Sequence, residues 1–305
     1  MSTSRLPEAV PVASGGAEVA RRVRRRVQLT PYLLLLPSTI FLLVFFAYPM
    51  VQSFGLAFRG DGGWTLKYFA TMVHDVAFAP ALRTTIVLIL ILLPVQFTLA
   101  LAMALVVQAR LRGSGLLLYI YSIPLGISEL AAGIVWFAIF TDRGYLNTLL
   151  TQLGVLSKPF VFLSYQNTGW LLGAIVLAEV WRATAIVMVI LVAGLQSIPH
   201  EFLEAADVFG ATLWDKTWRV ILPLLRPSLQ VALVLRTILA LQVFAVAMAV
   251  AGQGATLLAA EAYRWYNAYR NPNVAAAYAS LIMLLSIAST ALYLWGLRTP
   301  EEQAL

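Results

Sequence analysis

Ionisable side chains interrupt several long apolar segments of the chain, and these residues have the types that could do chemistry. They are Glu129, Glu179, Arg182 and Arg236, followed by the polar Gln242. A charge at the centre of a membrane helix costs about 2.5–3.5 kcal/mol on insertion scales, so each should face protein or water. Glu179 and Arg182 are three residues apart and can form an ion pair on one helix. Two interpretations stay open: these groups line a polar path, or they hold helices or subunits together.

Aromatic side chains lie in the same apolar segments. Trp136, Trp181 and Phe244 could stack on the rings of a sugar. Aromatic residues also dominate the cores and interfacial belts of membrane proteins, so packing or lipid contact explains each of them equally simply. Both interpretations stay open for these three residues.

The residue types that most enzymes use are sparse. The chain has no cysteine and only two histidines, and its three lysines all lack the preceding glycine of a G-x-x-x-x-G-K phosphate loop. His200-Glu201 superficially resembles the start of a zinc-protease helix, but Glu204 occupies the position of the second histidine. We therefore predict that the chain is not an enzyme and binds neither a metal nor a cofactor of its own.

Composition indicates the elements that must position these residues. Of the 305 residues, 61% are hydrophobic and 11% are charged, whereas an average soluble domain is about 25% charged. Apolar runs of about 20 residues predict an all-α polytopic membrane protein. The six expected spans cover residues of about 31–58, 81–108, 116–140, 169–195, 227–250 and 274–297.

The longest polar interruption runs from Ile198 to Pro227 and has an internal pattern. Pro199 suits the start of a helix, and Glu201, Glu204 and Asp207 follow at intervals of three, on one face. The opposite face gathers apolar side chains, namely Phe202, Ala205, Ala206 and Phe209. Gly210 then ends the helix, and Thr212 with Asp215 can cap a second helix that stops near Pro223. We expect two short helices joined at a glycine and lying beside the membrane.

This stretch resembles the EAA loop of permease subunits in binding-protein-dependent ABC importers, and the chain is similar to the carbohydrate-uptake branch of that family. The matching positions are Glu204-Ala205-Ala206, Gly210 and Leu222-Pro223, with weaker similarity at Gly144-Tyr145-Leu146-Asn147 and Glu179-Val180-Trp181. The family usually has Asp before the glycine, where this chain has Phe209. Phe209 is therefore expected to fill an apolar pocket on an ATPase or to pack against Trp214 or Trp218.

The resemblance implies a complete machine around this chain. A second homologous permease, identical or different, would complete the pathway for a sugar or related solute. Two ATP-binding cassette subunits, which bind ATP and Mg, would drive it, and an extracytoplasmic solute-binding protein would deliver the substrate. The coupling loop, residues 196–226, would dock in one ATPase, and its contact residues are Glu201, Glu204, Ala205, Ala206, Asp207, Phe209, Gly210, Leu222 and Pro223.

Charge predicts the orientation in the cell inner membrane. Five arginines precede the first span (Arg21, Arg22, Arg24, Arg25 and Arg26), so residues 1–30 should be a cytoplasmic tail. Six spans then place the 31–298 permease domain in the lipid bilayer and the 299–305 tail in the cytoplasm. Because membrane orientation accounts for the arginine cluster, no nucleic-acid partner is expected. The first apolar run is too long for a signal peptide, so we expect no cleavage there.

A rival hypothesis is a stand-alone secondary transporter or channel that uses Glu129, Glu179 and Arg236 as an ion relay. This hypothesis does not account for the EAA-like spacing of Glu204, Gly210 and Pro223. The substrate stays open, because arginines would suit a phosphate and aromatic residues would suit a sugar.

Overall fold

The computed structural model describes residues 32–60, 62–109 and 113–297. The arginine cluster at 21–26, the basic turn at Arg110 and Arg112, and the tail at 299–305 lie outside these residues. The chain divides into two units between Gly55 and Leu56. The described part of the first unit lies in a helix that runs from Tyr32 to Phe58. This helix contains a π-helical segment, η1 (Leu43–Ala47), which is followed by α2 (Tyr48–Phe58).

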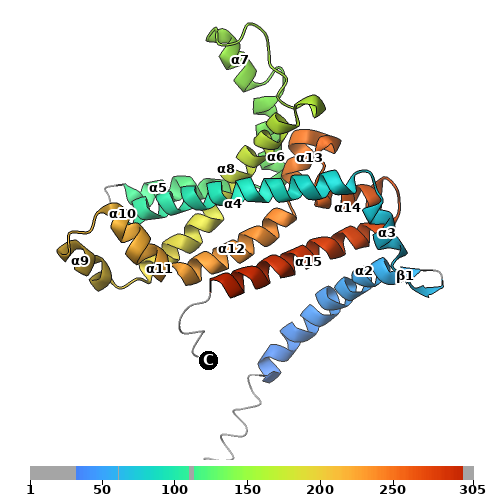
Figure 1. Cartoon of the computed structure of the whole chain (residues 1–305), viewed down its shortest axis with the longest axis horizontal. Helices are drawn as coiled ribbons and strands as arrows, with labels where there is room; N and C mark the ends of the chain where they lie inside the picture. Colours follow the sequence, from blue (N-terminus) through green and yellow to red (C-terminus); the bar gives the residue numbers. More distant parts are fainter. Residues whose placement is uncertain (1–31, 61, 110–112, 298–305) are drawn as a thin grey trace, which may run out of the picture. The chain divides into compact units, whose positions relative to one another are not determined.

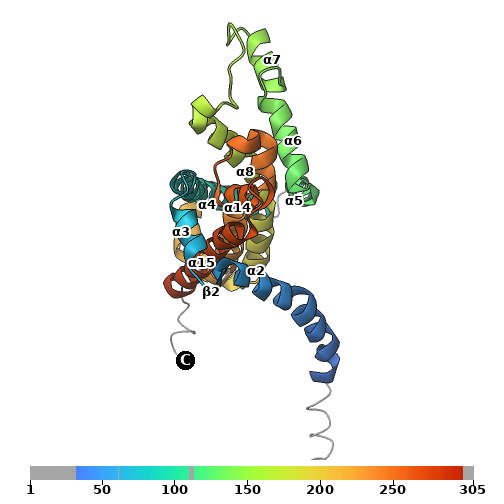
Figure 2. The ribbon, with the colours of Figure 1, turned by 90° about the vertical axis from the view of Figure 1, so that its right-hand side faces the viewer.

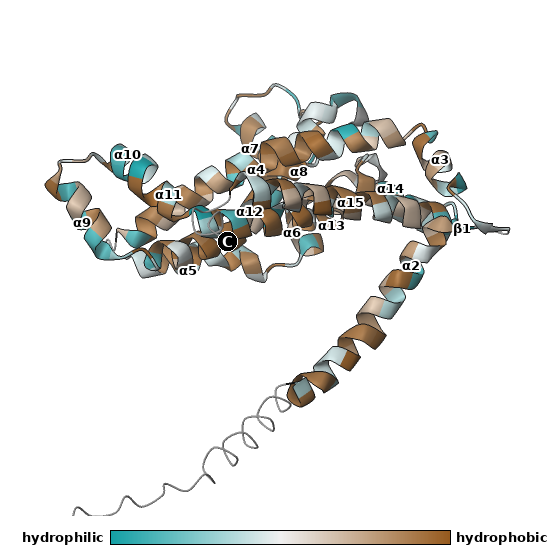
Figure 3. Cartoon of the chain, turned by 60° about the horizontal axis from the view of Figure 1, so that its bottom comes forward, coloured by the Kyte–Doolittle hydropathy of each residue, from teal (hydrophilic) through white to brown (hydrophobic). Residues whose placement is uncertain are grey.

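Within the described residues, four helices are long and apolar enough to cross a membrane. They are Tyr32–Phe58, α4 (Phe78–Gln108), α8 (Thr168–Gln196) and α15 (Pro272–Gly296). Two bent helix pairs raise the number to six if each pair counts as one span. The apolar character of α4, α8 and α15 is visible along their length in Figure 3.

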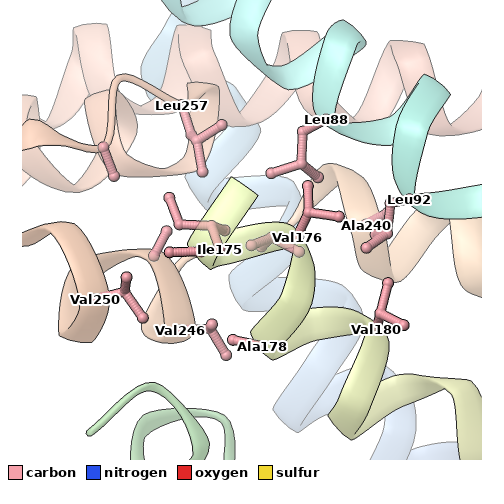
Figure 4. Close-up of a cluster of buried hydrophobic side chains, with 14 of the residues drawn as sticks. Leu88, Leu92, Ile175, Val176, Ala178, Val180, Ala240, Val246, Val250 and Leu257 are labelled. Carbon is pink, nitrogen blue, oxygen red and sulfur yellow. The ribbon is translucent and has the colours of Figure 1, made fainter. Parts of the chain in front are cut away.

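The second unit is built on α4, α8, α12 (Arg226–Leu241) and α15, which pack against one another (Figure 1). Leu88 and Leu92 of α4 lie in one core cluster with Ile175 of α8. Further along both helices, Ala100 and Ala104 lie in a second cluster with Leu195, so α4 and α8 run in the same direction. Figure 4 shows the first cluster, which α12 joins through Ala240 and the segment after it through Val246 and Val250.

Glycines set the closest helix contacts. A Cβ added at Gly194 of α8 would lie 2.2 Å from the Ser228 hydroxyl of α12 and 2.6 Å from its Cβ. A Cβ added at Gly133 of α6 would lie 2.5 Å from the Cβ of Ala249. Only glycine allows these backbones to approach so closely, which is typical of helix packing in membranes.

The third predicted span, 116–140, is wrong as a single helix. It consists of α5 (Ser114–Ser122), a 3-10 turn η2 (Ile123–Gly126) and α6 (Glu129–Phe140), and the two arms are bent by 99°. Pro124 disrupts helical hydrogen bonding at the break, and the Ser128 hydroxyl caps α6 by accepting from the Ala131 N–H at 3.2 Å. Apolar composition continues through the bend, so hydropathy alone did not reveal it.

The fifth predicted span, 227–250, is also interrupted. Helix α12 ends at Leu241, and α13 (Ala245–Ala251) starts after the non-helical Phe244. Val246 and Ala249 of α13 pack against Gly133 of α6, so tertiary packing overrides the continuous apolar pattern here.

Short elements connect these helices. They are β1 (Arg59–Gly60) paired antiparallel with β2 (Gly63–Trp64), α3 (Lys67–Val73), α7 (Tyr145–Gln152), η3 (Tyr165–Asn167), η5 (Gly252–Gly254) and α14 (Leu258–Asn267). Helix α7 begins directly after Gly144, where the weaker family similarity lies, and Figure 2 shows it beyond the end of α6. Its Asn147 is buried and bonds the backbone of Phe160 in both directions, at 2.8 and 2.9 Å.

Candidate functional site

The EAA-like loop folds as two helical segments joined at Gly210. Helix α9 (His200–Val208) follows Pro199 and ends at Gly210, whose φ of +72° is the left-handed conformation that favours glycine. The second segment comprises α10 (Leu213–Asp215), a π-helical η4 (Lys216–Ile221) and α11 (Leu222–Leu224). It meets α12 at a bend of 72°. The predicted pair of helices is confirmed, including the end near Pro223.

Local polar contacts fix the turn between the segments. The Thr212 hydroxyl accepts from the Asp215 N–H at 3.2 Å, so the predicted cap is present. The Thr212 hydroxyl also bonds the Asp215 carboxylate, and this bond holds the pKa of Asp215 below its usual value, with Arg219 adding to the effect. Lys216 forms an ion pair with Asp207, which ties the second segment to α9. These contacts make the two segments one unit.

The predicted contact residues lie on the outside of this unit. Ala206 and Leu222 are half-buried, and the other predicted contact residues are exposed, namely Glu201, Glu204, Ala205, Asp207, Phe209, Gly210 and Pro223. Neither Glu201 nor Glu204 has an ion-pair partner in the part of the chain that the structure describes. Figure 3 shows the polar colours concentrated in α9 and α10.

The apolar face of α9 opens into a hollow of about 390 Å³. Its lining includes Phe202, Phe209, Val220 and Pro223. Phe202 is 51% exposed and Phe209 is 89% exposed, so this chain does not cover the face itself. The expectation that Phe209 packs against a tryptophan is wrong, because Trp214 and Trp218 contact each other instead, with ring centroids 5.2 Å apart. Large exposed apolar groups beside water usually mark an interaction surface.

A second site is the charge network inside the helices. One guanidinium nitrogen of Arg236 donates to Glu179 Oε2 at 2.6 Å, and its Nε donates to Gln96 Oε1 at 2.6 Å. The Gln96 amide donates to the Glu179 carbonyl at 2.9 Å. Arg236 and Glu179 side chains are both about 1% exposed. The contacts therefore lock α4, α8 and α12 together at one level.

Arg182 extends the network toward α6. Its Nη2 lies 3.2 Å from Glu179 Oε1, which confirms the predicted pair, and 3.0 Å from Glu129 Oε1. Glu129 begins α6 just after the bend, and its side chain is 42% exposed. The two carboxylates and two guanidiniums balance in charge, as a buried ionic cluster requires.

Burial separates the two interpretations of these residues. For Glu179 and Arg236, burial favours the interpretation that they hold helices together. Glu129 reaches an exposed surface, so it could either hold helices together or line a polar path. Gln96 was missed by the sequence interpretation, although a lone amide in the middle of an apolar span is a visible signal.

The remaining predicted path residues lie away from the network's centre. Trp136 and Trp181 contact each other, with centroids 6.2 Å apart, on the α6–α8 side. Phe244 contacts Tyr263 with tilted rings whose centroids are 4.8 Å apart, and Gln242 is exposed at the helix break. No group of three or more His, Cys, Asp or Glu side chains able to hold a metal occurs among the described residues.

A bundle of apolar helices with an internal charge network and a polar two-helix loop is typical of a multi-pass membrane protein. Residues 96–296 match the family of binding-protein-dependent transport system inner membrane components, and the chain belongs to this family. The expected resemblance is thereby confirmed, and the protein is a multi-pass component of the inner membrane.

Curated relatives fall among sugar and glycerol-phosphate permeases. The chain is 30% identical to the trehalose/maltose transport system permease protein MalF of Thermococcus litoralis, over 86% of this chain and 92% of that protein. It is 30% identical to the sn-glycerol-3-phosphate transport system permease protein UgpA of Agrobacterium fabrum, over 87% and 93% of the two chains.

A solved structure has the same fold. A chain of a bacterial ABC transporter involved in the import of the acidic polysaccharide alginate aligns with a TM-score of 0.74 and 22% identity, covering 92% of this chain and 98% of that chain. A second structure of a bacterial alginate ABC transporter, in complex with an alginate pentasaccharide-bound periplasmic protein, aligns with a TM-score of 0.70.

Proposed function

We propose that this chain forms half of the translocation pathway of an ABC importer for a carbohydrate or related solute. The observation that carries the proposal is the α9–Gly210–Thr212 unit, which combines the EAA spacing with an uncovered apolar face. The names of the curated relatives, which include trehalose, maltose and glycerol-phosphate systems, support the substrate class. A second, homologous permease would supply the other half.

ATP hydrolysis on two partner subunits drives the cycle in this proposal. The exposed face of α9, with Glu204 and Phe209, docks in a groove of one ATPase. Because the Asp207–Lys216 pair and the Thr212 cap make the loop one unit, a displacement of α9 is transmitted through η4 to α12. Helix α12 carries Arg236, which contacts both α4 and α8, so the movement reaches the centre of the bundle.

The solute passes along an exposed polar and aromatic surface. The candidates are the exposed Glu129 and the Trp136–Trp181 pair, whereas the buried Glu179 and Arg236 hold the helices that carry them. A periplasmic solute-binding protein would deliver the solute at the opposite end from α9, and both termini would be cytoplasmic. The bilayer-facing surface is consistent with the many exposed leucine, isoleucine and valine side chains.

Affinity purification tests the proposal against the stand-alone alternative. The tagged chain is purified from its host in mild detergent, and the co-purifying proteins are identified by mass spectrometry. We expect an ATP-binding cassette subunit and a second permease. Purified chain alone is then placed in liposomes, and uptake of labelled maltose and glycerol 3-phosphate is measured. ATP-independent uptake by the isolated chain would contradict the proposal.

A further inference from the structure

A cavity of about 620 Å³ lies between the first turns of α4 and α8 and the loop after α13. Its lining includes Arg83 and Thr84 of α4, Thr168 of α8 and Thr256 of the loop. Helices α4 and α8 run in the same direction, and α9 follows the far end of α8. The cavity is therefore at the end of the bundle opposite to the coupling loop, away from the Glu179–Arg236 network.

The walls of the cavity are fixed by the fold. The Thr85 hydroxyl accepts from the Leu258 N–H at 3.1 Å, which ties the loop after α13 to α4. Ile175 and Leu257 line the cavity and also belong to the buried core cluster, where Figure 4 shows them. These core side chains make their part of the wall pre-formed, as most small-molecule sites are, whereas the Arg83 side chain is exposed.

The polar groups that line the cavity suit a ligand that carries an anionic group and hydroxyl groups. Arg83 is the only charged residue among the described residues that line the cavity, and no acidic side chain faces it there. Arg83 forms no ion pair in the part of the chain that the structure describes. Guanidinium stays charged at any physiological pH and binds carboxylate, phosphate or sulfonate through paired hydrogen bonds. The threonine hydroxyls suit the hydroxyl groups of a sugar or polyol.

We propose that this cavity is an entry subsite for a sugar or polyol that carries an anionic group, with Arg83 binding the anion and Thr84, Thr168 and Thr256 facing its hydroxyls. The volume is within the range of about 300–1,000 Å³ for small-molecule sites. The proposal deepens the proposed function by narrowing the substrate class to anionic carbohydrates, and it rests on that function.

The absence of cysteine makes a direct test possible. Thr84→Cys places one thiol beside Arg83, and the assembled transporter is held in nanodiscs of zwitterionic lipid. Two methanethiosulfonates are compared, one bearing a sulfonate and one a trimethylammonium group, and labelling of this chain is followed by intact mass. We expect the anionic reagent to react faster by about tenfold, the size of one close charge interaction. The ratio of the two rates cancels any effect of Arg83 on the thiolate fraction.

Matched variants test whether the Arg83 guanidinium causes the difference between the two labelling rates. Adding Arg83→Gln to Thr84→Cys should reduce the rate ratio to that of Gln152→Cys, an exposed position on α7. Adding Arg143→Gln, which removes an exposed arginine outside the cavity, should leave the ratio unchanged. An equal ratio with and without Arg83 would overturn the proposal. The readout needs neither ATP nor transport, so its failure is distinct from a failure of the proposed function.

Protection experiments identify the occupant. Glucuronate should slow labelling of Thr84→Cys by the anionic reagent, whereas glucose at the same concentration and ionic strength should not. Protection by glucose alone would overturn the anionic assignment. A lipid headgroup is the other possible anion, and nanodiscs that contain anionic lipid test for it. If that lipid abolishes the faster reaction of the anionic reagent, and glucuronate gives no protection, then the cavity holds a lipid headgroup. The solute proposal would then be wrong.

Discussion

Arg236 on α12 donates to Glu179 on α8 at 2.6 Å, and both side chains are almost completely buried. Removing Arg236 takes away the almost fully buried partner of Glu179 and leaves Glu179 only Arg182, on its own helix. Breaking a buried ion pair by removing one member typically costs about 3–5 kcal/mol. We predict that Arg236→Met lowers the thermal stability of the purified complex strongly, and that Glu179→Gln with Arg236→Met restores much of it. Thermal unfolding in detergent measures both. If the double variant is as unstable as the sum of the single variants, the pair is not coupled.

Arg182 has a different role from Arg236, because its loss leaves Glu179 paired. Arg182→Ala removes the partner of Glu129 at the start of α6, and we expect a loss of about 1–2 kcal/mol in stability. Uptake in vesicles should fall while the amount of assembled complex stays close to wild type. Arg182→Lys, which keeps the charge, should retain part of the uptake. Unchanged uptake by Arg182→Ala would exclude Arg182 from the pathway.

Gly194 controls the contact between α8 and α12. Gly194→Ala would place its Cβ 2.2 Å from the Ser228 hydroxyl, and such overpacking typically costs about 1–3 kcal/mol. Adding Ser228→Gly removes the clashing atoms and leaves only the flexible end of Leu225 at 2.8 Å. We therefore predict that the double variant melts closer to wild type than Gly194→Ala does. Equal melting temperatures of the two variants would refute the close contact.

Glu261 of α14 makes the free energy of unfolding depend on pH. Burial raises the pKa of Glu261 above its ordinary value, opposed by Arg264 and reinforced by Asp75. Since the folded protein then holds this proton more tightly than the unfolded chain does, stability decreases as pH rises from the ordinary pKa through the raised one. We predict that Glu261→Gln flattens this decrease on the alkaline side of the ordinary glutamate pKa of about 4.3. Parallel pH profiles of melting temperature for the two proteins would contradict the prediction.

The coupling loop could be predicted from the sequence because its determinants are local. Gly210 ends α9 and Thr212 caps the next segment through contacts within three residues, so spacing alone identifies them. The Glu179–Arg182 pair is local in the same sense. Phe209 was expected to find an apolar partner, but the structure leaves it open, which places that partner outside this chain in our proposal.

The charge network could be predicted only in part. Arg236 and Gln96 are 140 positions apart, and no periodicity relates them. The bend before Glu129 had signals in Pro124 and Gly126, but continuous hydropathy concealed it. The contact of α6 with α13 at Gly133 joins segments that are distant in the sequence and was not predictable from it. The Arg83 cavity likewise depends on three separated segments that only the fold brings together.

In the proposed coupling, α9 and Phe209 transmit the work of an ATPase to the membrane helices. The most direct test is ATP-driven uptake by the reconstituted complex carrying Phe209→Asp, with Leu153→Asp, an exposed leucine after α7, as the control. We expect that Phe209→Asp loses uptake while ATPase activity and thermal stability of the complex persist, and that Leu153→Asp transports normally. Wild-type uptake by Phe209→Asp would contradict the proposed coupling.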